Sequence, residues 1–234
     1  MSLANTPTNI APQQRTRIKM CGFTREADVL AACAAGADAI GFVLYPPSPR
    51  SVSIERAAEL ARLLPAFALP VLLFVNDTAE RIQAACKAVP GAWLQFHGDE
   101  TPEFCAAMTR LTGRPHLKAA RIPLSEVADF DLLEFALLHQ QAHALLLDAH
   151  VDGYGGGGRT FHWSLLPTSV NAHLVLSGGL TPANVGDGIR ALRSHGLSLA
   201  VDVSSGIEAA KGLKDAEKIQ QFVAAVRAAD ADLF

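Results

Sequence analysis

A cysteine and an aspartate each stand where an apolar run of the sequence ends. Cys21 closes RIKMC, residues 17–21, and Asp148 follows the apolar residues of ALLLDA, residues 144–149. A thiolate is a reactive group, and a poorly solvated carboxyl group keeps its proton near neutral pH because burial disfavours the charged form. We therefore predict a functional thiol at Cys21 and a proton donor at Asp148. The structural alternatives are a buried inert thiol and a cap for the next loop.

Two charged residues lie within apolar runs that a closed barrel would bring side by side. Side chains alternate along a strand, so Lys19 shares a face with Cys21, and Asp202 shares one with Ser204. We predict that Lys19 and Asp202 pair inside the barrel beneath Cys21, as part of the substrate site, and that the ammonium favours the thiolate. The alternative is a Lys19 that points outward into solvent.

Two further residues could bind a substrate. Arg50 lies in the proline-bounded segment PPSPRSVS, and its guanidinium fork suits a carboxylate. His97, in FHGDE, could position substrate or water. A surface arginine and a structural hydrogen bond of the histidine are the alternatives, and the second is as well supported as the functional interpretation.

Three glycine- or serine-rich segments follow the last three apolar runs: GGGGR at 155–159, SGGL at 177–180 and DVSSG at 202–206. Glycines let backbone N–H groups approach a phosphate closely, and barrels often bind phosphate after their last two strands. Ordinary tight turns are the alternative, which three such segments in succession make less attractive. The predicted phosphate-binding residues are Gly156, Gly157, Gly158, Gly178, Gly179, Ser204, Ser205 and Gly206.

The elements that must position these groups are eight short, nearly continuous apolar runs alternating with amphipathic segments. Such runs are typical of strands buried on both faces of a parallel sheet. Eight near-equal βα units without a GxGxxG after the first run favour a single (β/α)8 TIM barrel over an open doubly wound sheet. The predicted strands are 17–21, 39–44, 71–75, 93–97, 116–120, 144–149, 174–178 and 199–205.

Caps and stops define the predicted helices between these strands. Thr24, Ser53, Thr78, Thr101 and Thr181 are the N-cap candidates, the last two with proline in the next position. The predicted helices cover 24–36, 53–65, 78–91, 101–113, 181–196 and about 215–229, with a short helical piece near 163–167. Asp28, Glu55, Glu59 and Glu80 fit solvated helix faces.

The totals suit one globular domain. The chain has 234 residues, 50% of them hydrophobic, and a net charge of −3, which gives no basic surface for nucleic acid. We expect a loose tail over 1–14 and one barrel over 15–234. No run predicts a membrane span or signal peptide, and the four cysteines form no CxxC pair, so a reduced, cytoplasmic protein is expected. His139, His143 and His150 lack the spacing of a zinc site.

The ordered motifs of this chain resemble those of the phosphoribosylanthranilate isomerase family. They are KMCGFT (19–24), GFVLYPPSPRSVS (41–53), LQFHGDE (94–100), LLLDA (145–149), GGGGRTFHW (156–163), LSGGLTPANV (176–185) and DVSSGIEAAKGLKDAEKI (202–219).

This resemblance implies an Amadori rearrangement of N-(5-phosphoribosyl)anthranilate to 1-(2-carboxyphenylamino)-1-deoxyribulose 5-phosphate, a step of tryptophan biosynthesis. It implies that Asp148 is the general acid, that Cys21 is the general base, and that Arg50 holds the anthranilate carboxylate. It implies no cofactor or metal, and either a monomer or a homodimer. Gly157 stands where the family usually has threonine, and His162 where it has aspartate. The hydroxyl missing at Gly157 is expected to weaken phosphate binding slightly.

Two alternatives remain. Another sugar-phosphate barrel is one, but the isomerase of histidine biosynthesis would need an aspartate where Cys21 stands, and indole-glycerol-phosphate synthase a lysine acid with a glutamate pair. The other is a barrel that binds a sugar phosphate without catalysis. Cys21 and Asp148 argue against the second, because binding alone needs neither a base nor an acid.

Overall fold

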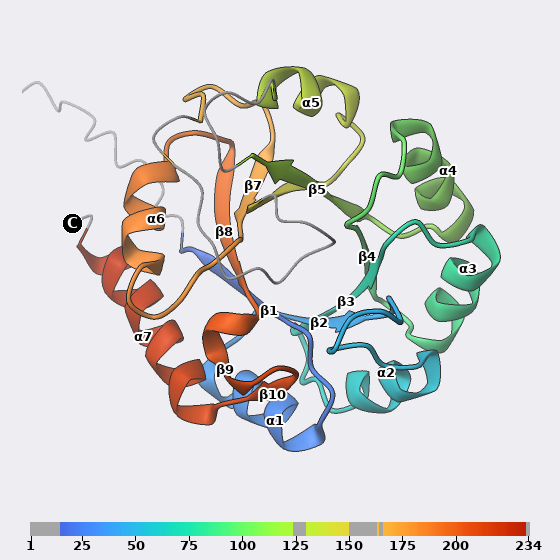
Figure 1. The fold of residues 1–234 in the computed structure, drawn as a ribbon, viewed down its shortest axis with the longest axis horizontal. Helices are drawn as coiled ribbons and strands as arrows, with labels where there is room; N and C mark the ends of the chain where they lie inside the picture. Colours follow the sequence, from blue (N-terminus) through green and yellow to red (C-terminus); the bar gives the residue numbers. More distant parts are fainter. Residues whose placement is uncertain (1–14, 124–129, 150–162, 164–165, 233–234) are drawn as a thin grey trace, which may run out of the picture.

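The computed structural model describes residues 15–123, 130–149, 163 and 166–232, and in these residues eight parallel strands close into a barrel (Figure 1). Each strand pairs with the next in chain order, and β1 also pairs with β8, which closes the ring. The predicted barrel is confirmed. The strands are β1 Arg17–Cys21, β2 Ala39–Val43, β3 Leu69–Phe74, β4 Trp93–Phe96, β5 His116–Ile122, β6 Ala144–Ala149, β7 His173–Leu176 and β8 Ser198–Val203.

The apolar runs of the sequence form these strands because both sheet faces are buried. Outward-facing residues such as Ile18 and Met20 pack against the surrounding helices and are fully buried. Inward-facing residues form smaller clusters within the barrel, one around Leu146 and another that includes Cys21 and Val43. This alternation puts Lys19, Cys21, Gln95, His97, Asp148, Ser177 and Asp202 on the inner face.

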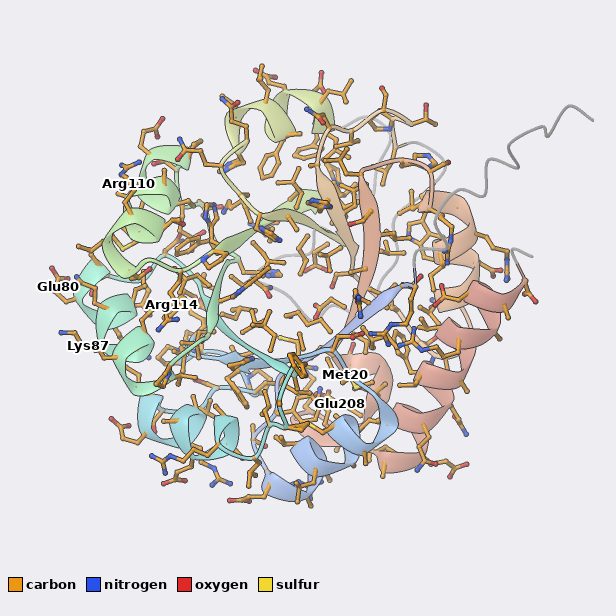
Figure 2. The ribbon with its side chains drawn as sticks, turned by 180° about the vertical axis from the view of Figure 1, so that it is seen from behind. Met20, Glu80, Lys87, Arg110, Arg114 and Glu208 are labelled. Atoms are coloured by element: carbon orange, nitrogen blue, oxygen red, sulfur yellow. The ribbon has the colours of Figure 1, made fainter. Side chains whose placement is uncertain are left out.

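The helices lie outside the barrel (Figure 1). Figure 2 shows Glu80 and Lys87 on the outer side of the ring of helices, whereas Met20 lies inward. The helices are α1 Glu26–Ala35, α2 Ile54–Ala61, α3 Ala79–Ala88, α4 Pro102–Thr112, α5 Leu132–Leu138, α6 Val185–Leu192 and α7 Ala216–Ala231. No helix in the described ranges is both long enough and apolar enough to cross a membrane.

Most of the predicted helix signals are confirmed. The side chains of Ser53, Thr78 and Thr101 cap α2, α3 and α4, and Asp215 caps α7. Gly36 ends α1 in the left-handed conformation with φ of 100°. The tail over 1–14 lies outside the described residues, as do residues 164 and 165 of the segment near 163–167.

Two predicted caps are wrong. Thr24 donates its hydroxyl to the carbonyl of Gly212, and α1 begins two residues later without a side-chain cap. Thr181 precedes a turn held by Asn184, whose Oδ1 accepts from the Thr181 amide at 2.8 Å, so α6 begins only at Val185. In both places the chain first completes a loop contact at the rim of the barrel.

A short hairpin after β8 was not predicted. The 3-10 helix Ser205–Ile207 leads into β9 Glu208–Ala210 and β10 Leu213–Lys214, which pair in antiparallel fashion around Gly212 with φ of 77°. Asp28, predicted on a solvated face, is instead buried at this hairpin. It accepts from the Lys214 amide at 3.2 Å and pairs with Arg25.

Candidate active site

The predicted catalytic side chains lie at the carboxyl ends of the strands, which is where barrel enzymes carry their chemistry. Cys21 is the last residue of β1, Asp148 lies near the end of β6, and His97 follows β4 directly. Arg50 lies in the loop after β2 and is buried together with the other three. The strands thus place all four at one end of the barrel.

Lys19 and Asp202 form the predicted ion pair. They are register partners on β1 and β8, and Lys19 Nζ lies 2.6 Å from Asp202 Oδ1, with each side chain about 6% exposed. Ser177 donates to the other Asp202 oxygen at 3.2 Å. Burial opposes the charge of Lys19, but the interactions with Asp202 and Cys21 together outweigh burial, and the pKa of Lys19 is raised. The alternative of an outward-facing Lys19 is therefore excluded.

Lys19 favours the Cys21 thiolate, as predicted, but burial has the larger effect on the pKa of this thiol. Burial raises the pKa of the Cys21 thiol, and although Lys19 and Lys214 lower it, the negative charge of Asp202 works against them. The net pKa lies above its ordinary value. The physical reason is that the ammonium of Lys19 is already neutralised by Asp202, so it offsets only part of the cost of burying a thiolate.

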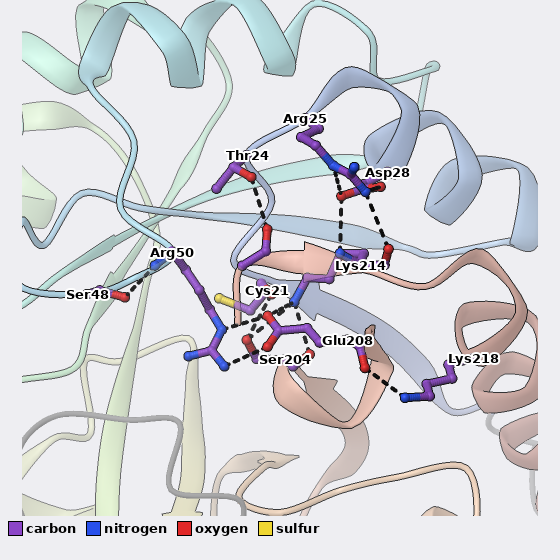
Figure 3. A network of polar contacts seen from close by, with 11 residues as sticks. Cys21, Thr24, Arg25, Asp28, Ser48, Arg50, Ser204, Glu208, Lys214 and Lys218 are labelled. Carbon is purple, nitrogen blue, oxygen red and sulfur yellow. Dashed lines mark hydrogen bonds and ion pairs between the residues drawn. The ribbon is translucent and has the colours of Figure 1, made fainter. Parts of the chain in front are cut away.

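Arg50 directs its guanidinium fork at a carboxylate of the protein itself. Its Nε lies 2.7 Å from Glu208 Oε1 and its Nη2 lies 2.8 Å from Glu208 Oε2. Lys214 reaches the same carboxylate at 2.9 Å and also donates to the Ser204 carbonyl at 3.0 Å. Figure 3 shows this network beside Cys21. The fork of Arg50 is thus fixed rather than solvated, and Glu208 balances two cations.

The charge states in this network follow from its geometry. Burial tends to raise the pKa of Glu208, but its bonds to Arg50 and Lys214 prevail, and the pKa is lowered. Burial lowers the pKa of Lys214, although Glu208 partly counters it. Cys21 interacts electrostatically with both cations. A thiolate or a substrate anion at this place would therefore meet two nearby cations.

His97 contacts Asp148 directly. Its Nε2 lies 2.9 Å from Asp148 Oδ2, and its Nδ1 lies 2.9 Å from Nε2 of Gln95. The loop after His97 is held from outside the barrel, because Glu100 accepts from the Gly98 amide at 2.9 Å and Lys118 donates to the Gly98 carbonyl at 2.7 Å. His97 thus forms the structural hydrogen bond that the sequence left as an alternative, and its partner is Asp148, the predicted acid.

With this geometry in place, comparison with known proteins identifies the family. A model of the N-(5'phosphoribosyl)anthranilate (PRA) isomerase family matches residues 18–225. The chain belongs to this family. The PRA isomerase of Methylibium petroleiphilum is 58% identical over 217 residues, which cover 93% of this chain and 96% of the relative. That of Leptothrix cholodnii is 57% identical, with 93% of each chain covered.

Solved PRA isomerase structures share the fold. The crystal structure from Thermotoga maritima superposes with a TM-score of 0.79 at 38% identity and covers 91% of this chain and 99% of its own. A PRA isomerase in complex with reduced 1-(o-carboxyphenylamino)-1-deoxyribulose 5-phosphate gives a TM-score of 0.76 at 36% identity, with the same coverage. A thiamine phosphate pyrophosphorylase at 17% identity shares the fold alone, with a TM-score of 0.64.

The structure describes only part of the predicted phosphate site of this PRA isomerase family member. Gly156, Gly157 and Gly158 lie outside the described residues. Gly178 and Gly179 follow β7 with φ of 76° and 64°, and the loop after β8 is packed against theirs, since a Cβ on Gly206 would stand 1.9 Å from the Leu180 carbonyl oxygen. Ser205 and Gly206 open a short 3-10 helix.

Ser204 has a structural contact that the sequence did not suggest. Its hydroxyl donates to the Cys21 carbonyl at 3.0 Å and so joins the ends of β8 and β1.

Glu208, Lys214 and Gln95 are the polar residues of the site that sequence reasoning missed. The first two lie on the β9–β10 hairpin, whose only signal in the sequence is the glycine of AAKGLK. Gln95 had a clearer signal, because it stands two residues before His97 and so faces the same way along β4.

A cavity of about 340 Å³ opens at the opposite ends of the strands. Its wall is mainly apolar, and the charged and polar groups that border it are engaged: Lys19 with Asp202, Asp38 with Arg17, and His173 with Ser198. Neither Cys21 nor Asp148 lines this cavity. Among the described residues no three His, Cys, Asp or Glu side chains gather in a way that could hold a metal ion.

Proposed function

We propose that this chain isomerises N-(5'-phosphoribosyl)anthranilate in tryptophan biosynthesis, with Asp148 as general acid and Cys21 as general base. Membership of the PRA isomerase family supports the reaction. The observation that carries the residue roles is the placement of a buried carboxyl group and a buried thiol at the same end of one barrel. A simple binding site would need neither group.

The proposed reaction transfers protons only. Asp148 gives its proton to the ring oxygen of the ribose, the bond between that oxygen and C1′ breaks, and the anthranilate nitrogen forms a protonated imine. The Cys21 thiolate then takes the proton from C2′, and the released electron pair gives an enolamine. Movement of the C2′ hydroxyl proton toward C1′ completes the ketone. Substrate and product are isomers, so return of one proton to Asp148 and loss of one from Cys21 restore the protein.

The substrate's two anionic ends fit different parts of the site. The anthranilate carboxylate is proposed to meet the guanidinium of Arg50, whose orientation is fixed by Glu208. The phosphate is proposed to lie on the loops after the last strands, at Gly178, Gly179, Ser205 and Gly206 and at the glycines 156–158. Positive φ at Gly178 and Gly179 turns the backbone in a way that other residues rarely adopt.

The setting of the protein stays a prediction. All four cysteines are free thiols, which supports a reducing compartment such as the cytoplasm. A small-molecule substrate requires no second chain, and both a monomer and a homodimer are compatible with the site as proposed.

Turnover of phosphoribosylanthranilate tests the proposal, followed through the fluorescence of the substrate in wild type, Cys21→Ser and Asp148→Asn. We expect wild-type turnover, and a fall of kcat by about two orders of magnitude or more in each variant, as is typical for loss of a positioned acid or base. Full activity in either variant would contradict that residue's role. An inactive wild type whose melting temperature still rises with inorganic phosphate would instead support the binding-only barrel.

A further inference from the structure

Gln95 lies in the barrel interior next to His97, the residue that contacts the predicted acid Asp148. The sequence motifs assigned Gln95 no role. Its side chain is completely buried, and its Nε2 lies 2.9 Å from His97 Nδ1. On the other side of the ring, His97 Nε2 lies 2.9 Å from Asp148 Oδ2. Within the described part of the chain, the amide oxygen of Gln95 is buried without a hydrogen-bond partner. The three side chains form one line of hydrogen bonds that ends at Asp148.

The direction of this line decides where the ring proton of a neutral His97 must be. An amide N–H of Gln95 can bond to Nδ1 only if Nδ1 is bare, which leaves the single ring proton on Nε2. The N–H group at Nε2 then points at Asp148 Oδ2, and this carboxyl oxygen accepts a hydrogen bond from it. The side chain of Gln95 thus acts on Asp148 through the imidazole, without contacting it.

The opposite orientation of the amide gives a different arrangement at Asp148. Oε1 of Gln95 would accept from a proton on Nδ1, and a bare Nε2 would face Oδ2, which fits only if Oδ2 carries the acid proton. The amide N–H groups would then stand where the oxygen now has no partner. A buried N–H without an acceptor is rarer than a carbonyl oxygen left unused, so the first orientation is favoured.

We propose that Gln95 is a positioning residue that holds His97 as its Nε2–H tautomer. Oδ2 of Asp148 then always accepts a hydrogen bond from His97, and the proton that Asp148 transfers to the substrate sits on Oδ1. Gly178 leaves space at that oxygen. A Cβ at this position would stand only 3.0 Å from Oδ1, and glycine has no Cβ. This inference rests on the proposed role of Asp148 as the acid.

Charged groups on the neighbouring strands have ion-pair partners of their own. Lys118 of β5 pairs with Glu100 at 2.9 Å, and Lys19 of β1 pairs with Asp202. Arg121, the register partner of Asp148 on β5, lies 3.7 Å from Asp99. Among the described residues, the ring of His97 forms hydrogen bonds with one neutral amide and one carboxyl group. Of these two, only the amide can select the tautomer independently of Asp148.

The direct test is nitrogen NMR of the His97 ring in the ¹⁵N-labelled wild-type protein near neutral pH. The two ring nitrogens of a neutral histidine differ strongly in chemical shift according to which one carries the proton. We expect a protonated Nε2 and a bare Nδ1. A proton on Nδ1 with a bare Nε2, or a doubly protonated ring, overturns the inference.

Two substitutions of nearly equal size separate positioning from packing. When it is ionised, the glutamate of Gln95→Glu places a carboxylate at Nδ1 that can only accept, so it should draw a proton to Nδ1. We expect kcat to fall by about 10- to 100-fold, the loss typical of changing a residue that orients a reacting side chain. Gln95→Met, the matched control, removes both donor and acceptor, leaves the tautomer unrestrained and should lower kcat less, with KM nearly unchanged in both variants. Equal values of kcat in the two variants, both folded by thermal melting, contradict the inference.

The outcomes distinguish this inference from the proposed function. An inactive Asp148→Asn variant together with a wild-type proton on Nδ1 keeps Asp148 as the acid and removes the role of Gln95. An active Asp148→Asn variant removes the acid assignment, whatever the tautomer of His97 is. The NMR measurement uses the wild-type protein and needs no substitution. It can therefore refute the inference even if the Gln95 variants fail to fold.

Discussion

Gly41 leaves room for the thiol of Cys21. The two residues are register partners on β2 and β1, and a Cβ built on Gly41 would stand 2.6 Å from the Cys21 sulfur. Its other near neighbours would be the Cα and Cβ of Cys21 at 3.1 and 3.2 Å. The absence of a side chain at Gly41 is therefore part of what places the proposed base.

Gly41→Ala should displace this sulfur and reduce kcat by about 100-fold, because a shift of about 1 Å at a reacting atom has an effect of that size. Steady-state turnover of phosphoribosylanthranilate measures it. Gly186→Ala is the matched control, since a Cβ there would meet its nearest neighbour at an ordinary 3.5 Å. Unchanged kcat in Gly41→Ala would show that the thiol does not need this position.

The bond between Glu208 and Arg50 should control substrate affinity more than chemistry. In Glu208→Gln an amide replaces the carboxylate, so the guanidinium of Arg50 keeps only one acceptor oxygen and is held less firmly. Arg50 and Lys214 also lose the negative charge that balances them. We expect KM to rise by about 10-fold, a cost of roughly 1.4 kcal/mol, with a smaller change in kcat. Steady-state kinetics on the folded variant measure both.

Glu59→Gln is the control for that variant, because Glu59 pairs with Arg56 on an exposed helix face and should leave KM unchanged. A Glu208→Gln variant with normal KM would mean that Arg50 is held by other contacts or does not meet the substrate.

The barrel itself could be predicted because its signal is repeated along the chain. Eight buried runs each carry the same pattern, and residues such as Lys19 and Asp202 stand out within them as charges that only an interior partner can satisfy. Their pairing followed from alternation and closure alone, and the 2.6 Å contact confirms it. Regular elements therefore determined most of the proposed site.

The contacts of Arg50 could not be predicted in the same way. Its partner Glu208 is 158 residues away on a hairpin of two very short strands, which has no periodicity to detect. The raised pKa of Cys21 was also beyond the sequence, since it depends on how completely Lys19 is neutralised and on how little water reaches the sulfur. Both features depend on tertiary contacts that no local pattern of the sequence encodes.

Two buried histidines should make the fold sensitive to mild acid. Burial, with a contribution from the charge of Lys118, lowers the pKa of His116 to about 4 and that of His139 to about 4. The unfolded chain binds these protons at an ordinary pKa of about 6.5. The free energy of unfolding should therefore have its full value above pH 6.5. As the pH drops toward 4 it should fall by roughly 1 to 3 kcal/mol per histidine, because the unfolded chain takes up protons that the folded protein does not.

Urea unfolding at a series of pH values measures this dependence. His116→Gln should flatten the fall, since glutamine takes up no proton, although the loss of the bond to Thr109 lowers stability at every pH. A pH dependence of the same slope in this variant would assign the effect to other groups.

Lys19→Met should move the pH dependence of the reaction. The Lys19 ammonium lowers the pKa of Cys21, and Asp202 raises it. Without the ammonium the pKa of the thiol rises further, and because the base must be a thiolate, the rising limb of kcat/KM shifts to higher pH. We expect the rate at pH 7 to fall by about 10-fold for each unit of that shift.

Lys19→Met with Asp202→Asn removes both charges and is the control for the first variant. Since the carboxylate that raises the thiol's pKa is then gone as well, the limb of the double variant should lie between those of Lys19→Met and wild type. The pH profile of kcat/KM in the three proteins measures the order. A limb that stays at the wild-type pH in Lys19→Met would mean that the rate does not depend on ionisation of Cys21, and the thiol would then have to be replaced as the proposed base.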